Sequence, residues 1–458
     1  MQTMQQCQPV ARKEYRWEFI FLAGLFCFYF IWALTQPFDS APDERMRFEV
    51  VEYIFRHGSL PSGGELEIRD ELWGFSYAFN PILPYMIAAV FMKAASFFSS
   101  NAFVLVMAAR MVSILSGVGT AFFAIRIARN LFPGKARWFN VVLVALLPSA
   151  VFVTSYVNCD AFAIFSTAVI VYCWIRGVQT RWDSKSCIGL ALGISMCALS
   201  YYNAYGFILC SILFYGITQL LFCRQQHAYK AFWQKGLLIS VIVLVLIGWW
   251  FIRNYMLYDG DLLGSRTSTL YGELYAAAEY KPSARITPQG TGISLWEMLV
   301  QPWGTFEDGW VSITAESFIG TFGYLNVFLS KKVVYVYWAL LLGGLGLLLV
   351  HPVKLFAVRC KAQWQVRPIF NWCMLLAALI PNILNVYYSY TSDYQPQGRY
   401  SLPMLLPLMY LVATGYQNAI EKFIKKERWR NIVYIVLAAG IALAAIYAYV
   451  RVLYPAYH

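Results

Sequence analysis

Two adjacent carboxylates, Asp43 and Glu44, follow the first long apolar run of the chain, in the stretch QPFDSAPDERMRFEVVEYIFRHGSLP at residues 36–61. A carboxylate at the edge of a membrane can accept a proton from an attacking hydroxyl or amide group. Partial burial near lipid raises its pKa toward a value that suits this task. Acids are also favourable at the start of a helix. The pair therefore predicts either catalysis or helix capping.

A third acid, Asp160, stands in the stretch SYVNCDAFAIF, in a turn of a few residues between two apolar runs. Placing a charge inside a membrane span costs roughly 2.5–3.5 kcal/mol on insertion scales. An acid held this close to the bilayer is therefore a candidate for catalysis or substrate orientation. The alternative is that Asp160 caps the helix that follows it.

Several basic residues stand beside the acid-containing loops, where positive-inside statistics disfavour them. Arg253 ends one apolar run, Arg399 begins another, Lys331 precedes a third, and Arg110 lies within a fourth. The planar fork of arginine suits a phosphate group, and lysine binds phosphate as a point charge. We predict that Arg399, Arg253 and Lys331 bind a donor phosphate. The alternative is that they pair with nearby aspartates.

Polar aromatic residues suggest a substrate pocket. Tyr202 and Asn203 end an apolar run, and Tyr400 follows Arg399. These residues could line a sugar pocket or belong to an interfacial belt. Asp259 and Asp261 form a D-x-D pattern that can hold a divalent cation, although the pattern alone is weak evidence. We expect no required metal and leave a divalent cation open.

The composition indicates the kind of scaffold that positions these residues. Of the 458 residues, 59% are hydrophobic and 13% are charged, whereas soluble domains average about 25% charged residues. We therefore expect one integral membrane domain over residues 1–458. The net charge of +12 comes from basic clusters between apolar runs. Positive-inside topology and contact with membrane lipids explain these clusters better than nucleic acid binding does.

The apolar runs predict an all-α polytopic membrane protein with about eleven transmembrane helices. They lie at residues 17–36, 102–125, 138–157, 161–176, 187–203, 205–223, 237–256, 332–350, 368–389, 400–418 and 431–452.

The charges of the loops orient these helices. The loop at 126–137 carries four basic residues and no acid, so we place it in the cytoplasm together with the N-terminus. The other loops then agree if the run at 81–98 lies along the outer surface as a juxtamembrane helix. The basic loops that face the cytoplasm are then 177–186, 224–236, 351–367 and 419–430, and the acid-containing loops that face outside are 36–80, 158–160, 257–331 and 390–399. This leaves two large external loops, 36–101 and 257–331. We expect a multi-pass protein of the cytoplasmic membrane whose active site faces outside.

An acidic pair after the first span and a second acid after the third resemble the GT-C superfamily of membrane glycosyltransferases. APDERMRF and NPILPYM resemble the first external loop of the protein O-mannosyltransferases and of the lipid A aminoarabinose transferase. A closer resemblance is to a bacterial multipass family known as a domain of unknown function, through PDE, NCDAFAI, GWWFIRNYMLYDGD, SFIGTFGY and QGRYSLPMLLP. The chain departs from that family by having YDGD in place of YGD-Pro.

The resemblance implies transfer of a sugar from a polyprenyl-phosphate carrier to a glycan, lipid or protein of the cell envelope. Arg399 and Arg253 would hold the phosphate, and Asp43 would be the base for an acceptor that attacks with inversion. Asp160 and Glu44 would orient the substrates. Two alternatives are a transporter or flippase of a lipid-linked or small polar substrate, and a non-catalytic lipid-binding assembly subunit.

Overall fold

The computed structural model describes residues 12–350 and 366–458, and nearly all of its regular structure is helical. Its α-helices are α1 (Arg12–Thr35), α2 (Glu44–His57), α3 (Leu83–Ser96), α4 (Ala102–Leu131), α5 (Ala136–Ala145), α6 (Pro148–Val153), α7 (Asp160–Thr180), α8 (Ser184–Ala198), α9 (Gly206–Gln226), α10 (Tyr229–Leu257), α11 (Ser265–Tyr275), α12 (Leu295–Val300), α13 (Trp310–Gly320), α14 (Lys331–Val350), α15 (Val366–Thr391), α16 (Leu405–Phe423), α17 (Glu427–Tyr447) and α18 (Tyr454–Tyr457).

Shorter elements connect these helices. Single 3₁₀ turns are η1 (Leu66–Ile68), η2 (Tyr77–Phe79), η3 (Tyr202–Ala204), η4 (Ala278–Tyr280) and η5 (Pro282–Ala284). A longer 3₁₀ helix, η8, covers Gly398–Met404, and a π-helical turn, η9, covers Ala448–Leu453. Two short antiparallel strands, β1 (Thr321–Phe322) and β2 (Val327–Phe328), pair Thr321 with Phe328.

The membrane prediction is confirmed, but the count of eleven spans is not. Within residues 12–350 and 366–458, eight helices are long and apolar enough to cross a membrane. They correspond to α1, α4, α7, α9, α10, α14, α15 and the helical stretch that starts with α17. The other three predicted spans, at 138–157, 187–203 and 400–418, are helical in the structure, but none of them forms a helix that is both long and apolar enough to cross a membrane.

The predicted span at 138–157 shows why the count differs. It consists of α5 and α6, which are separated at Leu146 and Leu147, and Pro148 is the first residue of α6. Proline has no N–H to donate to the preceding turn, so a continuous helix stops before it. The predicted span at 187–203 is the 15-residue helix α8. Such a helix is about 22 Å long, less than the roughly 30 Å hydrocarbon core of a bilayer.

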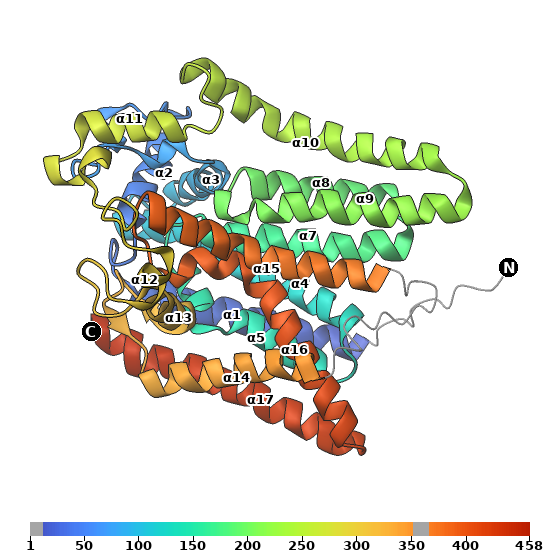
Figure 1. The fold of residues 1–458 in the computed structure, drawn as a ribbon. Helices are drawn as coiled ribbons and strands as arrows, with labels where there is room; N and C mark the ends of the chain where they lie inside the picture. The colour runs from blue at the N-terminus through green and yellow to red at the C-terminus, as the bar shows by residue number, and fades with distance from the viewer. Residues whose placement is uncertain (1–11, 351–365) are drawn as a thin grey trace.

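The connecting segments gather at the two ends of a bundle of long helices (Figure 1). At one end, Tyr258 Oη donates to the carbonyl of Ser62 at 2.8 Å, and the amide of Gln289 donates to the carbonyl of Tyr390 at 3.1 Å. These bonds join the acid-containing segments 36–101, 257–331 and 390–399.

Basic loops meet at the other end of the bundle. Gln179 Nε2 donates to Asn130 Oδ1 at 2.6 Å, and Lys235 Nζ donates to the carbonyl of Arg181 at 2.8 Å. The described residues therefore separate acid-containing from basic segments, as the charge pattern predicts. The predicted basic loop at 351–367 lies almost wholly outside the described residues.

Helix α3 stays at the end that carries the acid-containing segments. Its buried residues, among them Ala88 and Met92, pack in one apolar cluster with Ala109 near the start of α4 and with Leu199, which follows α8. Its 14 residues extend for about 21 Å, too short to cross the bilayer. The geometry of α3 agrees with the juxtamembrane helix expected at 81–98.

Candidate active site

Asp43 stands directly before α2 in a left-handed backbone conformation, with φ at 62°. For a residue other than glycine this conformation is uncommon and is held in place by the surrounding structure. The Asp43 side chain forms no capping hydrogen bond to α2. The carboxylate is therefore directed to other partners, and the helix-capping alternative does not account for it.

Two arginines from different elements meet the Asp43 carboxylate. Arg399 Nη2 lies 2.7 Å from Asp43 Oδ2, and Arg47 Nη2 lies 3.5 Å from the same oxygen. Burial by itself would raise the pKa of Asp43, but the positive charges of Arg399 and Arg47 outweigh burial and hold that pKa below its ordinary value. The expectation that burial raises the pKa of this carboxylate is therefore wrong for Asp43, which is ionised at neutral pH, and 26% of its side chain remains exposed.

Asp160 joins this group through Arg47. Arg47 Nη1 lies 3.2 Å from Asp160 Oδ2, and the two side chains are only 3% and 2% exposed. Asp160 is the first residue of α7, yet Asn158 Oδ1 accepts the hydrogen bond from the amide of Ala161 there. Asp160 Oδ1 is buried and has no hydrogen-bond partner among the described residues. Asp160 is thus part of the charged cluster and caps no helix through its side chain.

Glu44 has a different environment from its neighbour. It is fully buried, and Arg110 contacts both of its oxygens at 2.8 Å, through Nε to Oε1 and through Nη2 to Oε2. The amides of Val157 and Asp39 also donate to this carboxylate, each at 3.1 Å. Glu44 therefore ties α2 to α4, to the turn before α7 and to the segment after α1.

Arg110 completes this connection by contacting the C-terminal end of α1. Its Nη1 donates to the carbonyls of Ala33 and Gln36 at 2.6 and 2.7 Å, and its Nη2 donates to that of Pro37 at 3.2 Å. Unpaired carbonyls at a helix C-terminus favour a cation. With the two bonds to Glu44, all five N–H groups of this guanidinium have acceptors. The Glu44–Arg110 pair is therefore an anchor that fixes the chain on either side of Asp43.

A close backbone approach positions Arg399 at the start of η8. The amide of Gly398 donates to Ser317 Oγ at 2.8 Å, and a Cβ atom at Gly398 would lie 2.1 Å from the nitrogen of Phe318. Glycine is the residue that permits this approach. Arg399 also contacts Tyr400 Oη at 3.0 Å, and its Nε is buried without a hydrogen-bond partner among the described residues. Arg399 thus contacts both Asp43 and Tyr400, and its guanidinium lies beside the buried hydroxyl of Tyr156.

Two other predicted phosphate-binding residues have partners elsewhere. Arg253 Nη2 donates to the carbonyl of Pro61 at 2.6 Å. The ammonium group of Lys331 lies 3.5 Å from Glu316, and 65% of the Lys331 side chain is exposed. The structure therefore does not bring Arg253 or Lys331 into the cluster of Asp43, Asp160 and Arg399.

Of the three predicted pocket residues, one belongs to the cluster of Asp43, Asp160 and Arg399, and two have contacts elsewhere. Tyr400 contacts Arg399 and belongs to the cluster. Tyr202 Oη donates to the carbonyl of Leu263 at 2.5 Å, and Asn203 Nδ2 donates to Tyr201 Oη at 3.1 Å. Tyr202 and Asn203 thus serve local contacts in the structure, and their role as substrate ligands stays a prediction.

The Asp261 carboxylate of the D-x-D pattern accepts hydrogen bonds at the start of α11. Its oxygens accept hydrogen bonds from the amides of Gly264 and Thr267 at 3.0 and 2.8 Å, and from the Thr267 hydroxyl at 3.0 Å. Within residues 12–350 and 366–458, no group of three or more His, Cys, Asp or Glu side chains could hold a metal ion. The D-x-D pattern is therefore used for local structure.

The sequence reasoning did not assign a role to Arg47, Tyr77 or Tyr156. Arg47 follows Asp43 by four residues, a spacing that places the two side chains on one face of a helix and was the available signal. The Arg47 guanidinium lies 4.8 Å from the centre of the Tyr77 ring. Tyr156 is fully buried, and its hydroxyl lies beside the guanidinium of Arg399. Nothing in the sequence pattern marked these two tyrosines.

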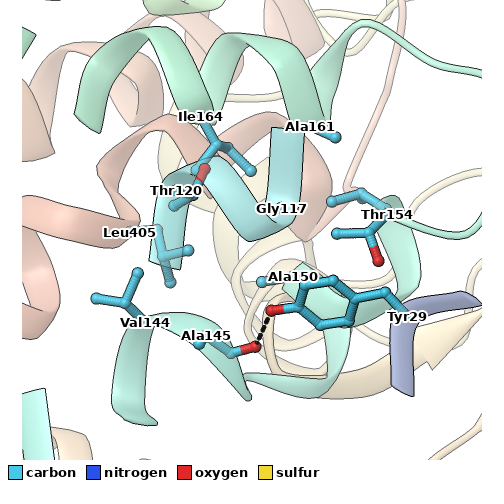
Figure 2. Close-up of a pocket in the computed structure, with 11 residues that line it drawn as sticks. Tyr29, Gly117, Thr120, Val144, Ala145, Ala150, Thr154, Ala161, Ile164 and Leu405 are labelled. Atoms are coloured by element: carbon cyan, nitrogen blue, oxygen red, sulfur yellow. Dashed lines mark hydrogen bonds between the residues drawn. The ribbon is translucent and has the colours of Figure 1, made fainter. Parts of the chain in front are cut away.

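A small cavity of about 20 Å³ lies near the start of α7, and Ala161, the neighbour of Asp160, lines it. Figure 2 shows the hydroxyl of Tyr29 directed at the carbonyl of Ala145, to which it donates at 2.6 Å. A cavity of this size has room for about one water molecule. It is therefore too small for a sugar, and the exposed edge of Asp43 is the accessible part of the cluster.

A larger hollow of about 430 Å³ lies on the side of the Glu44–Arg110 pair, with Arg110 in its wall. Its other lining residues are Leu34, Thr35, Gln36, Pro37, Phe38, Ala102, Phe103, Val106, Tyr457 and His458. The hollow thus combines a largely apolar wall with one buried guanidinium.

Comparisons with known proteins give the fold a context. No protein-family model matches the chain, and no curated protein matches it in sequence. The closer resemblance to the bacterial domain-of-unknown-function family therefore stays a prediction.

Solved structures do match. The structure of ArnT from Cupriavidus metallidurans bound to undecaprenyl phosphate has a TM-score of 0.51 at 13% identity, over 98% of this chain and 74% of ArnT. The apo oligosaccharyltransferase of Archaeoglobus fulgidus has a TM-score of 0.53 at 12% identity, over 95% of this chain and 55% of that protein. The A. fulgidus oligosaccharyltransferase AglB, in complex with an inhibitory peptide and a dolichol-phosphate, has a TM-score of 0.50 at 12% identity, over 98% of this chain and 56% of AglB.

The chain spans about three quarters of ArnT and just over half of the oligosaccharyltransferase. At these identities the likeness concerns the fold. The chain therefore has a membrane fold similar to those of ArnT and the A. fulgidus oligosaccharyltransferase, which agrees with the fold class expected from its sequence.

Proposed function

We propose that this protein is a membrane glycosyltransferase that moves a sugar from a polyprenyl-phosphate carrier to an acceptor at the outer face of the cytoplasmic membrane. The observation that carries this proposal is the meeting of Asp43, Asp160 and Arg399, which come from three distant segments and are joined by Arg47. The GT-C-like fold and the lipid phosphates bound by ArnT and AglB support the same class of donor.

In the proposed reaction, an acceptor hydroxyl or amide attacks the anomeric carbon of the donor sugar. Asp43, which is ionised and partly exposed, takes the proton of the attacking group. The bond between the anomeric carbon and the phosphate oxygen breaks, and the lipid phosphate leaves with the electron pair. Attack from the face opposite the leaving group inverts the anomeric configuration.

Arg399 is the residue that we assign to the leaving phosphate. Its Nε has no partner among the described residues, and its Nη2 already contacts Asp43 at 2.7 Å. A guanidinium placed between base and phosphate can neutralise charge that develops on the leaving group. Asp160 would orient the substrate indirectly, by holding Arg47 beside Asp43, because its own side chain is only 2% exposed.

We also propose a location for the lipid. The hollow of about 430 Å³ has a largely apolar wall and lies beside the Glu44–Arg110 anchor. We place part of the prenyl chain there, and we place segments 36–101 and 257–331 outside the cytoplasmic membrane, with the N-terminus in the cytoplasm. We also propose that residues 1–458 form a single integral membrane domain.

A transfer assay tests this function directly. The purified full-length protein in lipid nanodiscs is supplied with undecaprenyl-phosphate-linked sugars and an envelope extract as acceptor. Release of undecaprenyl phosphate together with sugar on the acceptor supports the proposal. Movement of intact lipid-linked sugar across a liposome bilayer, with no cleavage, supports a flippase instead.

We expect Arg399→Ala to weaken binding of undecaprenyl phosphate by about 10- to 100-fold, since a hydrogen bond to a charged group contributes about 1.5–3 kcal/mol. The measurement is a titration of the full-length protein in nanodiscs with undecaprenyl phosphate. Lys331→Ala is the matched control, because Lys331 pairs with Glu316 outside the cluster, and it should leave the affinity unchanged. An unchanged affinity in Arg399→Ala and a loss in Lys331→Ala would move the phosphate site to Lys331.

A further inference from the structure

Arg47 occupies an unusual position between two acids of the candidate site. Its Nη1 and Nη2 lie 3.2 Å from Asp160 Oδ2 and 3.5 Å from Asp43 Oδ2. The guanidinium is 3% exposed, and the Tyr77 ring covers it at 4.8 Å. One buried cation thus bridges carboxylates that lie 117 positions apart in the sequence, at residues 43 and 160.

A solved structure with a similar fold raises the question of a metal ion in this protein. The A. fulgidus oligosaccharyltransferase has been solved in complex with Zn and sulfate, with a TM-score of 0.50 to this chain. Protein ligands bind zinc at about 2.0–2.3 Å and usually number three or more. Between Asp43 and Asp160 the described residues supply a guanidinium, whose positive charge repels a metal ion. The residues of this chain therefore do not fit a divalent cation at the bridge.

The charges of the cluster lead to the same conclusion. Asp43 and Asp160 contribute two negative charges, and Arg47 and Arg399 contribute two positive charges. Arginine stays protonated in proteins, and its planar fork holds two carboxylates in a fixed relation. Helix α2 fixes the origin of the Arg47 side chain one turn after Asp43. The bridge is therefore present without any ion from solution.

We propose that Arg47 takes the place of a divalent cation between Asp43 and Asp160. It contacts both carboxylates and holds them in a fixed relation to each other. Arg47 is a positioning residue in this account, and only its consequence for sugar transfer rests on the proposed function.

Binding of Mn²⁺ to the full-length protein in nanodiscs, followed by electron paramagnetic resonance, tests this role without any need for transfer. The wild-type protein and the Asp160→Asn variant should bind the same amount of Mn²⁺. Arg47→Gln should gain at least about tenfold in Mn²⁺ affinity, and the double variant Arg47→Gln/Asp160→Asn should lose that gain. Arg45→Gln is the matched control: it lies on the same helix, is 60% exposed and pairs with Asp39. It should behave as the wild-type protein does.

Two results would overturn the proposal. One is a Mn²⁺ ion bound by the wild-type protein and lost in Asp160→Asn. The other is an Mn²⁺ affinity of Arg47→Gln that equals that of the wild type in a sample whose thermal unfolding shows it to be folded. Arg47→Lys keeps the positive charge and should bind no more Mn²⁺ than the wild type does.

The transfer assay separates this proposal from the proposed function. Sugar transfer that continues in the presence of EDTA supports both the glycosyltransferase assignment and the role of Arg47. Transfer that EDTA abolishes and Mn²⁺ restores contradicts the role of Arg47 and leaves the glycosyltransferase assignment intact. If no polyprenyl-phosphate sugar is used and the Mn²⁺ results still hold, the assignment fails and the bridging role of Arg47 remains.

Discussion

Asp43→Asn should lower sugar transfer by about 10²–10⁴-fold, the contribution of a positioned general base. Asparagine has nearly the same shape as aspartate but cannot take the proton of the acceptor. The variant should still bind undecaprenyl phosphate, because the guanidinium of Arg399 is retained. The measurement is the initial rate of undecaprenyl phosphate release from a lipid-linked sugar in nanodiscs.

Asp39→Asn provides the matched control for this experiment. Asp39 lies four residues earlier in the same segment, where its carboxylate pairs with Arg45 at 2.7 Å and accepts a hydrogen bond from Tyr324 Oη at 3.0 Å. Its replacement should change the rate by less than about twofold, in line with the small contribution of a surface ion pair. A normal rate in Asp43→Asn would remove Asp43 from the mechanism, whatever the control shows.

Glu44→Gln should destabilise the protein by about 3–5 kcal/mol, because it leaves the charge of Arg110 buried without its partner. Both residues are at most 2% exposed, and the Glu44 carboxylate also accepts from the amides of Val157 and Asp39. The loss can be measured by denaturant or thermal unfolding of the purified protein in detergent. Replacing both partners, as Glu44→Gln/Arg110→Met, should recover part of it.

Glu52→Gln is the control on the same helix. The Glu52–Arg56 pair has its side chains 35% and 61% exposed, and a pair of this kind contributes about 0.3–0.5 kcal/mol. Equal destabilisation by Glu44→Gln and Glu52→Gln would contradict the anchoring role of Glu44. It would also leave the left-handed conformation of Asp43 without the support assigned to it.

The different environments of Asp43 and Glu44 could not be predicted from the sequence. Acids that follow an apolar run are visible in a sequence, and both were predicted to do chemistry. Which of them faces a substrate depends on Arg110, which lies 66 residues after Glu44 and is directed at the end of α1. A pairing over that distance leaves no periodic signal, so the structure was needed to separate an anchor from a catalytic candidate.

The fold class was predictable, but the details of the bundle were not. Hydropathy and loop charge predicted an all-helical membrane protein with charged segments sorted to two ends, which agrees with the described residues. The structure has fewer spanning helices than predicted, partly because the chain is interrupted at Pro148 and because α8 is short. Local breaks of this kind are weak features in a hydrophobic run, so the sequence did not reveal them.

The sequence also did not predict which basic residues contact Asp43. Arg399, Arg253 and Lys331 were chosen because each stands beside an acid-containing loop. Only Arg399 reaches Asp43, since η8 packs on α13 through the close approach of Gly398 to Phe318. Arg253 and Lys331 are held by Pro61 and Glu316 instead. Sequence position could place these charges at one end of the bundle, but side-chain packing decided which of them meet.

A density map of the full-length protein with undecaprenyl phosphate tests the central claim most directly, because that claim is the meeting of Asp43, Asp160 and Arg399 at one substrate site. The account predicts the phosphate within hydrogen-bond distance of Arg399, on the exposed side of Asp43, with the start of the prenyl chain toward the hollow beside Arg110. A phosphate bound at Lys331 or Arg253, with Asp43 and Arg399 still paired and remote from it, would contradict the account.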